Sequence, residues 1–147
     1  MAKILVSACL MGCECRYKGD SCRNEKILAL AGEHTLLAVC PEQMGGLPTP
    51  RYPAEIQGGR LINSAGSDVT AEYRKGAETA CYLAKLNGVK LAVMKANSPS
   101  CGHGLIYDGS FSGNKVPGNG VTAELLEDSG IKVFTEDELD ELMKVLS

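Results

Sequence analysis

The stretch KILVSAC, residues 3–9, is a short apolar run that ends in a cysteine. Three similar runs, each rich in valine, isoleucine or leucine, occur later in the chain at residues 36–39, 89–94 and 131–134. Compact runs of this kind are typical of parallel strands that are covered on both faces of a sheet. The sequence therefore predicts a parallel sheet of about four strands, the first of which covers residues 3–8.

Helical patterns lie between and after these strands. They cover residues 24–31, residues 68–86, residues 121–129 and a C-terminal segment that begins with a capping box of Thr135 and Glu138. Strands that alternate with helices are joined by right-handed crossovers in a parallel sheet. We therefore expect an α/β fold, a single-domain Rossmann-like sheet flanked by helices, over residues 1–147.

A segment rich in proline and glycine, residues 41–67, interrupts the α/β pattern. Its prolines, at positions 41, 48, 50 and 53, argue against a regular helix there. Gly58-Gly59 lies between two short apolar runs and predicts the turn of a hairpin insertion. A second irregular stretch, residues 98–120, is rich in glycine and serine. Loops of this length in a small domain are often functional.

The composition is that of an ordinary globular chain. Hydrophobic residues make up 44% of the 147 residues, charged residues make up 22%, and the formal net charge is −3. A mildly acidic chain is a poor ligand for phosphate backbones, which disfavours stand-alone nucleic-acid binding. Since no apolar run is long enough for a membrane span or a signal peptide, we expect a cytoplasmic protein without a membrane partner.

Three of the seven cysteines directly follow predicted strands or lie in the loop after one. Cys9 follows the first strand, Cys40 follows the second, and Cys101 lies in the loop after the third. Because the carboxyl ends of parallel strands meet at one edge of a sheet, these thiols are expected to converge. Cysteine thiolates suit zinc or an iron–sulfur cluster, and three ligands leave one coordination position open.

Other interpretations of the cysteines stay open at this point. Buried cysteines are often simply small core residues, and Cys81 inside the long predicted helix fits that description. A local zinc site of Cys9, Cys13, Cys15 and Cys22 is a further alternative, although the spacing is irregular for a zinc ribbon. The corresponding functional alternative is a zinc-binding or thiol-based metal or redox sensor without catalysis.

An ordered set of segments resembles one bacterial family. The segments are residues 5–10, 15–17, 40–51, 66–70, 98–102, 106–111 and 120–123. In these segments and their order the chain is similar to the thiouracil desulfidases, and the likeness covers almost its whole length. The resemblance implies a [4Fe–4S] cluster held by Cys9, Cys40 and Cys101, the same three cysteines that strand placement selects.

The resemblance also implies a reaction without net electron transfer. The iron without a protein ligand takes the sulfur of a thiolated pyrimidine, and water replaces it to give a carbonyl and sulfide. The catalytic acid/base residues of the family correspond to Glu42 and Ser98. Burial near the cluster is expected to raise the pKa of Glu42, which suits a general base.

Arg51 and Ser100 are the expected substrate contacts. Arg51 follows a proline-rich loop, and its planar guanidinium suits a substrate phosphate, although an ion pair with Glu55 explains it equally well. Arg16 is a weaker candidate of the same kind, and His103 is a candidate ligand or proton donor. The expected partner is a small-molecule thio-base or thio-nucleotide, and the sequence leaves a homodimer open.

Overall fold

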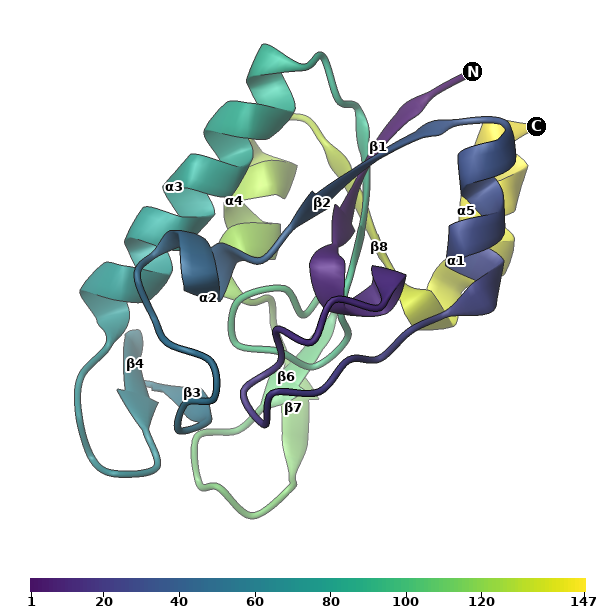
Figure 1. The fold of residues 1–147 in the computed structure, drawn as a ribbon. Coiled ribbons are helices and arrows are strands. Elements are labelled where there is room, and N and C mark those ends of the chain that lie inside the picture. Colours follow the sequence, from purple (N-terminus) through teal and green to yellow (C-terminus); the bar gives the residue numbers. More distant parts are fainter.

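A parallel sheet of four strands forms the centre of the structure (Figure 1). The computed structural model describes residues 1–147. The strands are β1 (Lys3–Ser7), β2 (Thr35–Val39), β5 (Leu91–Met94) and β8 (Lys132–Thr135). They lie in the order β2-β1-β5-β8, and all three pairings are parallel. The predicted α/β class and the predicted parallel sheet are thus confirmed.

Strand β1 lies inside the sheet and buries side chains on both of its faces. Ile4 and Val6 point into one hydrophobic cluster, whereas Leu5 between them points into the other. All three side chains are at most 1% exposed, and burying each one contributes about 1.5–3 kcal/mol. Burial on both faces is the physical reason why this strand reads as an unbroken apolar run.

Helices cover both faces of the sheet and contribute to the hydrophobic cluster on each face (Figure 1). One pair is α3 (Thr70–Leu86) and α4 (Val121–Asp128), and the other is α1 (Glu25–Ala29) and α5 (Leu139–Leu146). Between β8 and α5 a short turn, Glu136–Glu138, carries the predicted capping box of Thr135 and Glu138. None of these helices has the length and apolar character that a membrane span requires.

Helix α2 (Pro41–Met44) is a single turn that the sequence analysis did not expect, because prolines argued against helix in this segment. Proline is tolerated here because it occupies the first helical position, where its missing N–H has no partner to lose. The turn packs closely on α3, since a Cβ atom at Gly45 would collide with the carbonyl of Glu72, and one at Gly76 with the carbonyl of Pro41.

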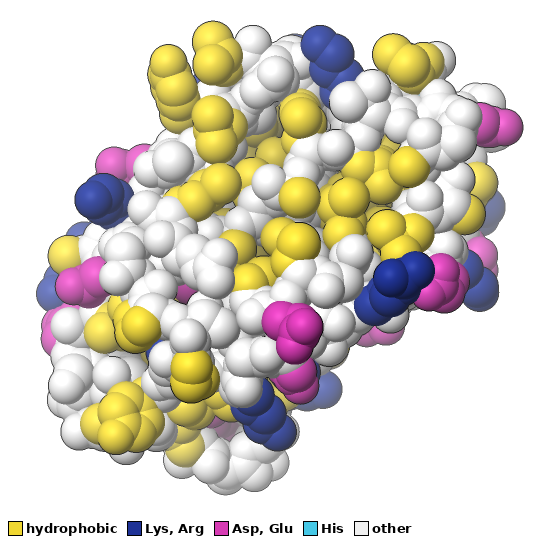
Figure 2. Space-filling model, in the orientation of Figure 1, with side chains coloured by type: hydrophobic (Ala, Val, Ile, Leu, Met, Phe, Trp, Pro, Cys, Tyr) yellow, Lys and Arg dark blue, Asp and Glu magenta, His cyan; other side chains and the backbone are white.

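Two antiparallel hairpins lie near the carboxyl edge of the sheet (Figure 1). Strands β3 (Ala54–Gln57) and β4 (Arg60–Asn63) pair across Gly58-Gly59. Strands β6 (Leu105–Tyr107) and β7 (Lys115–Pro117) pair within the stretch that the sequence analysis left irregular. On the face shown in Figure 2, lysine and arginine side chains are scattered among acidic and apolar ones.

Candidate metal centre and active site

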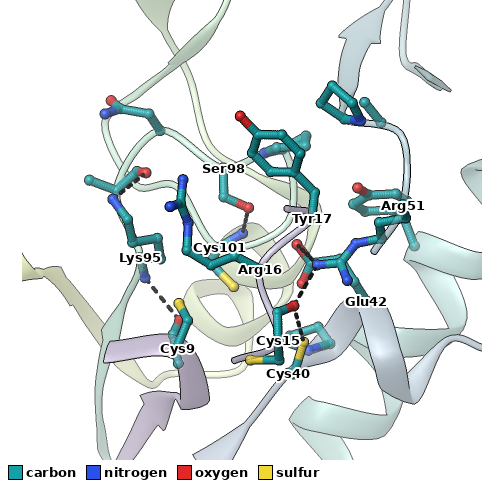
Figure 3. Close-up of a pocket in the computed structure, with 18 of the residues that line it drawn as sticks. Cys9, Cys15, Arg16, Tyr17, Cys40, Glu42, Arg51, Lys95, Ser98 and Cys101 are labelled. Atoms are coloured by element: carbon teal, nitrogen blue, oxygen red, sulfur yellow. Dashed lines mark hydrogen bonds and ion pairs between the residues drawn. The ribbon is translucent and has the colours of Figure 1, made fainter. Parts of the chain in front are cut away.

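A cavity of about 420 Å³ lies where strands β1, β2 and β5 end (Figure 3). Cys9 lines it from the turn after β1, Cys40 from the end of β2, and Cys101 from the loop after β5. Glu42 and Ser98 line the same cavity. The structure therefore brings together the three cysteines and the two acid/base candidates that the sequence analysis named.

Burial keeps two of these thiols protonated when no cation is bound. Burial, with added repulsion from the nearby Cys22 and Glu42, raises the pKa of Cys9 to about 12. Burial also raises the pKa of Cys101, and the charge of Glu42 adds to the effect. Deprotonating several thiols around one cavity is thus costly unless a metal neutralises them.

Cys15 is a fourth thiol in the cavity, considered above only as part of the alternative local zinc site. The Cys40 Sγ donates to the backbone carbonyl of Cys15 at 3.8 Å (Figure 3), and the Cys15 thiol stabilises the ionised form of Cys40 by donating a hydrogen bond to it. The hydrogen bond from Cys15 lowers the pKa of Cys40 to about 7. The pKa of Cys15 itself is raised by this hydrogen bond and by burial. Cys40 is therefore the thiol in the cavity that ionises most easily.

The donor set fits an iron–sulfur cluster. Four thiols line one cavity, and soft thiolate ligands are those that iron–sulfur clusters take. No three His, Cys, Asp or Glu side chains are arranged to hold a single metal ion, so the geometry gives no support to a mononuclear zinc site. Cys13 is exposed, and Cys81 is buried in α3 with its Sγ 3.3 Å from the Ser129 Oγ.

Glu42 is a buried carboxylate at the start of α2. Its side chain is 13% exposed, and its Oε2 lies 3.7 Å from the Arg51 Nη2. Burial raises the pKa of Glu42, and the positive charge of Arg51 offsets part of that rise. The direction of this shift is the one expected from the sequence. A carboxylate with a raised pKa is a stronger base than an ordinary one.

Ser98 organises the loop that carries Cys101. Its Oγ accepts hydrogen bonds from the backbone N–H groups of Ser100 and Cys101, each at 3.0 Å. Because the oxygen accepts both of these bonds, its own hydroxyl proton stays free to be donated elsewhere. The residue lines the cavity, so this proton can serve a group bound there.

Arg51 lies at the site but is not free to bind a phosphate. Its side chain is 7% exposed, and it donates to the carbonyl of Cys15 at 3.0 Å and to the Thr49 Oγ1 at 3.0 Å. The expected ion pair with Glu55 is wrong, because Arg51 faces Glu42 instead. Glu55 accepts the backbone N–H groups of Gly109 and Phe111.

Two further candidates do not line the cavity. Ser100 is fully buried, and its Oγ lies 2.8 Å from the Thr122 Oγ1 and accepts from the Cys101 Sγ at 3.8 Å, so this hydroxyl supports the candidate ligand loop. His103 pairs with Glu127 at 2.6 Å and does not line the cavity. Arg16 does line the cavity, but it forms an ion pair with Asp20 at 3.1 Å.

The sequence analysis also missed Lys95 and the aromatic side chains of the cavity wall. Tyr17, Tyr107 and Phe111 line the cavity, and Lys95 lies on the wall opposite Glu42 (Figure 3). Lys95 directly follows the third predicted strand. The rule that selected the cysteines, position at the carboxyl end of a strand, was thus a signal that could have found it.

Comparison with known proteins agrees with this geometry. The family model for 2-thiouracil desulfurase matches residues 4–138. The uncharacterized protein YbbK of Bacillus subtilis is 45% identical over 150 residues, which cover 95% of this chain and 99% of that protein. The solved structure of the [4Fe-4S]-dependent thiouracil desulfidase TudS superposes with a TM-score of 0.94 at 49% identity, covering 99% of this chain and 98% of that one. The chain therefore belongs to the 2-thiouracil desulfurase family.

Proposed function

We propose that this protein is a [4Fe–4S]-dependent desulfidase that converts the C=S group of a thiolated pyrimidine base or nucleotide to C=O. The observation that carries the proposal is the presence of Cys9, Cys40 and Cys101 on one cavity together with the buried Glu42. The likeness to TudS over nearly the whole of both chains supports the same reaction. The proposal includes a small-molecule substrate, a cytoplasmic location and a single domain over residues 1–147.

Cys9, Cys40 and Cys101 are the residues that would hold the cluster. The bound cluster would supply an iron with an open coordination position, which is a Lewis acid suited to a thiocarbonyl sulfur. The overall change is hydrolytic: the oxygen of water bonds to the ring carbon, and the carbon–sulfur bond breaks. One proton of the water leaves with the sulfur as hydrogensulfide, and the other passes through the general base to solvent. No electron is gained or lost.

Glu42 is placed to act as the general base. Its carboxylate lies in the cavity, and burial raises its pKa toward the range in which it can take a proton from water. Arg51 keeps this carboxylate in place, since its other donors are fixed by backbone and side-chain oxygens. Ser98 is placed to donate its free hydroxyl proton to the pyrimidine ring, where negative charge develops during attack.

Metal analysis and turnover test the proposal together. Protein purified under anaerobic conditions should contain about four irons and four sulfides per chain, and it should convert thiouracil to uracil with release of one sulfide per uracil. Chromatography of the bases and a colorimetric sulfide assay measure this conversion. Stoichiometric zinc without sulfide would contradict the proposal, and so would a metal-free protein whose thiols oxidise reversibly. Those two results would favour the zinc or thiol-sensor alternative.

A further inference from the structure

Lys95 is a half-buried cation that the proposed mechanism does not use. It directly follows β5, and its side chain is 23% exposed. It lines the cavity on the same side as Cys9, across from Glu42 (Figure 3). A charged group that loses most of its water needs compensating partners, so the neighbours of this ammonium group show what holds it there.

Glu136 holds Lys95 in a fixed position. One of its carboxylate oxygens accepts a hydrogen bond from the Lys95 Nζ at 2.7 Å, and the other accepts the backbone N–H of Ala96 at 2.7 Å. The backbone N–H of Lys95 donates to the Ser7 Oγ at 2.9 Å. The carboxylate ties the ammonium group to the start of the Glu136–Glu138 turn, and the backbone contact ties Lys95 to Ser7 at the end of β1.

The surroundings of Lys95 favour its charged form. Burial alone would lower the pKa of Lys95, but the hydrogen bond and charge of Glu136, together with the nearby Cys22 and Cys9, raise it above its ordinary value. The interaction is mutual, because the charge of Lys95 acts to lower the pKa of Cys9. The ammonium group therefore stays protonated in a cavity that Cys9 also lines.

The other two cations that line the cavity are, like Lys95, paired with acids. Arg51 faces Glu42 on the opposite wall and donates to the carbonyl of Cys15. Arg16 forms an ion pair with Asp20, which is half-exposed. Of the three, Lys95 is the cation whose charge acts on Cys9.

We propose that Lys95 supplies the positive charge of the metal centre and binds the hydrogensulfide anion that the reaction releases. This inference rests on the proposed function. Three thiolates give the site an excess of negative charge, and an anionic product adds to it. A fixed ammonium group in a partly desolvated cavity stabilises both the thiolates and the anionic product, because charges interact more strongly there than in water.

Three variants test the role of Lys95 in the cluster-loaded protein: Lys95→Met, Lys95→Arg and Glu136→Gln. The readouts are the affinity for hydrogensulfide, followed by visible absorption, and the midpoint reduction potential of the cluster. Lys95→Met should weaken hydrogensulfide binding about tenfold, as expected for the loss of one close charge, and should make the potential more negative. Lys95→Arg should restore most of the affinity.

Glu136→Gln decides between an electrostatic and a purely structural role. It leaves the charge of Lys95 uncompensated, so it should strengthen hydrogensulfide binding and make the potential more positive. Lys95→Met and Glu136→Gln break the same ion pair, so both should lower the melting temperature. If the role of Lys95 were purely structural, the hydrogensulfide affinity and the reduction potential would also change in the same direction in both variants.

The outcomes separate this inference from the proposed function. If the wild-type protein desulfidates thiouracil but Glu136→Gln leaves affinity and potential unchanged, or shifts them as Lys95→Met does, the inference is overturned and the proposed function stands. If the wild-type protein carries no cluster and releases no sulfide, both fall together. Opposite shifts in the two variants support the assignment of Lys95.

Discussion

The two walls of the cavity each carry a partly buried ion pair, but they offer opposite charges to the thiols. On one wall Glu42 and Arg51 lie 3.7 Å apart, and Glu42 acts to raise the pKa of Cys9, Cys40 and Cys101. On the other wall Lys95 and Glu136 are 2.7 Å apart, and Lys95 acts to lower the pKa of Cys9. In the longer pair the pKa of Glu42 is raised, whereas in the shorter pair Lys95 stays charged.

This difference teaches that similar residue pairs can prepare different chemistry in one cavity. Burial outweighs Arg51 at Glu42, so the carboxylate gains affinity for a proton. At Lys95 the hydrogen bond and charge of Glu136 outweigh burial, so the proton stays on. One wall is therefore suited to proton transfer and the other to anion binding.

Removing a thiol that lies between the two walls should have the largest effect. Cys101→Ser should lose the cluster and lower turnover by a factor of about a thousand or more, a loss comparable to those seen when enzymes lose their main electrostatic catalyst. Iron and sulfide analysis and the thiouracil assay measure both effects. Cys81→Ser is the matched control, because Cys81 is also buried but lies in α3 away from the cavity. A cluster retained in Cys101→Ser would remove this cysteine from the ligand set.

Replacing the carboxylate on the Glu42 wall should separate catalysis from cluster binding. Glu42→Gln keeps the size of the side chain and removes the base, so turnover should fall by about 10²–10⁴ while the iron content stays unchanged. Steady-state kinetics and metal analysis on the same preparation provide the measurement. Unchanged turnover in this variant would show that Glu42 is not the base.

Removing Arg51 should change the pH dependence of the activity. Arg51 lowers the pKa of Glu42, so Arg51→Met should raise that pKa further. Activity that needs the ionised carboxylate should then appear only at higher pH, and the acidic limb of the rate profile should move upward. Arg16→Met serves as the control, because Arg16 lines the cavity but pairs with Asp20. If both variants gave the wild-type profile, Arg51 would have no influence on the base.

The raised pKa of Glu42 also predicts how stability depends on pH. Between its ordinary value of 4.5 and the raised value in the fold, the folded state binds more protons than the unfolded state. The free energy of unfolding of the cluster-free, reduced protein should therefore decrease as the pH rises through this window. Denaturant titrations at several pH values measure it, and Glu42→Gln should flatten the slope there. If the free energy of unfolding increased with pH through this window in the wild type but not in Glu42→Gln, the pKa of Glu42 would be lowered in the fold rather than raised.

The smallest effect should come from the thiol pair beside the Glu42 wall. The hydrogen bond from Cys15 lowers the pKa of Cys40, so Cys15→Ser should raise it and slow alkylation of Cys40 several-fold at neutral pH in the cluster-free protein. Mass spectrometry of the Cys40 peptide measures the rate. Cys13→Ser, which changes an exposed thiol, should leave that rate unchanged. An equal rate in Cys15→Ser would show that the Cys15 thiol does not control Cys40.

Most of the sheet and part of the site could be read from local sequence pattern. The apolar run at residues 3–8 predicts a strand because Ile4, Leu5 and Val6 alternate between the two hydrophobic clusters. The placement of Cys9, Cys40 and Cys101 after strands then implies one shared edge, since parallel strands all end on the same side. The capping box of Thr135 and Glu138 was equally visible, because both partners lie within four residues.

The sequence by itself thus determined which elements form and on which edge the thiols meet. Only the tertiary structure decided the partners of the charged side chains. Arg51 reaches the carbonyl of Cys15 across 36 positions of the chain, and Lys95 reaches Glu136 across 41. The signals for helices, caps and buried strands depend on a few neighbouring residues. The partner of a long charged side chain depends instead on which distant segments the packed core brings together.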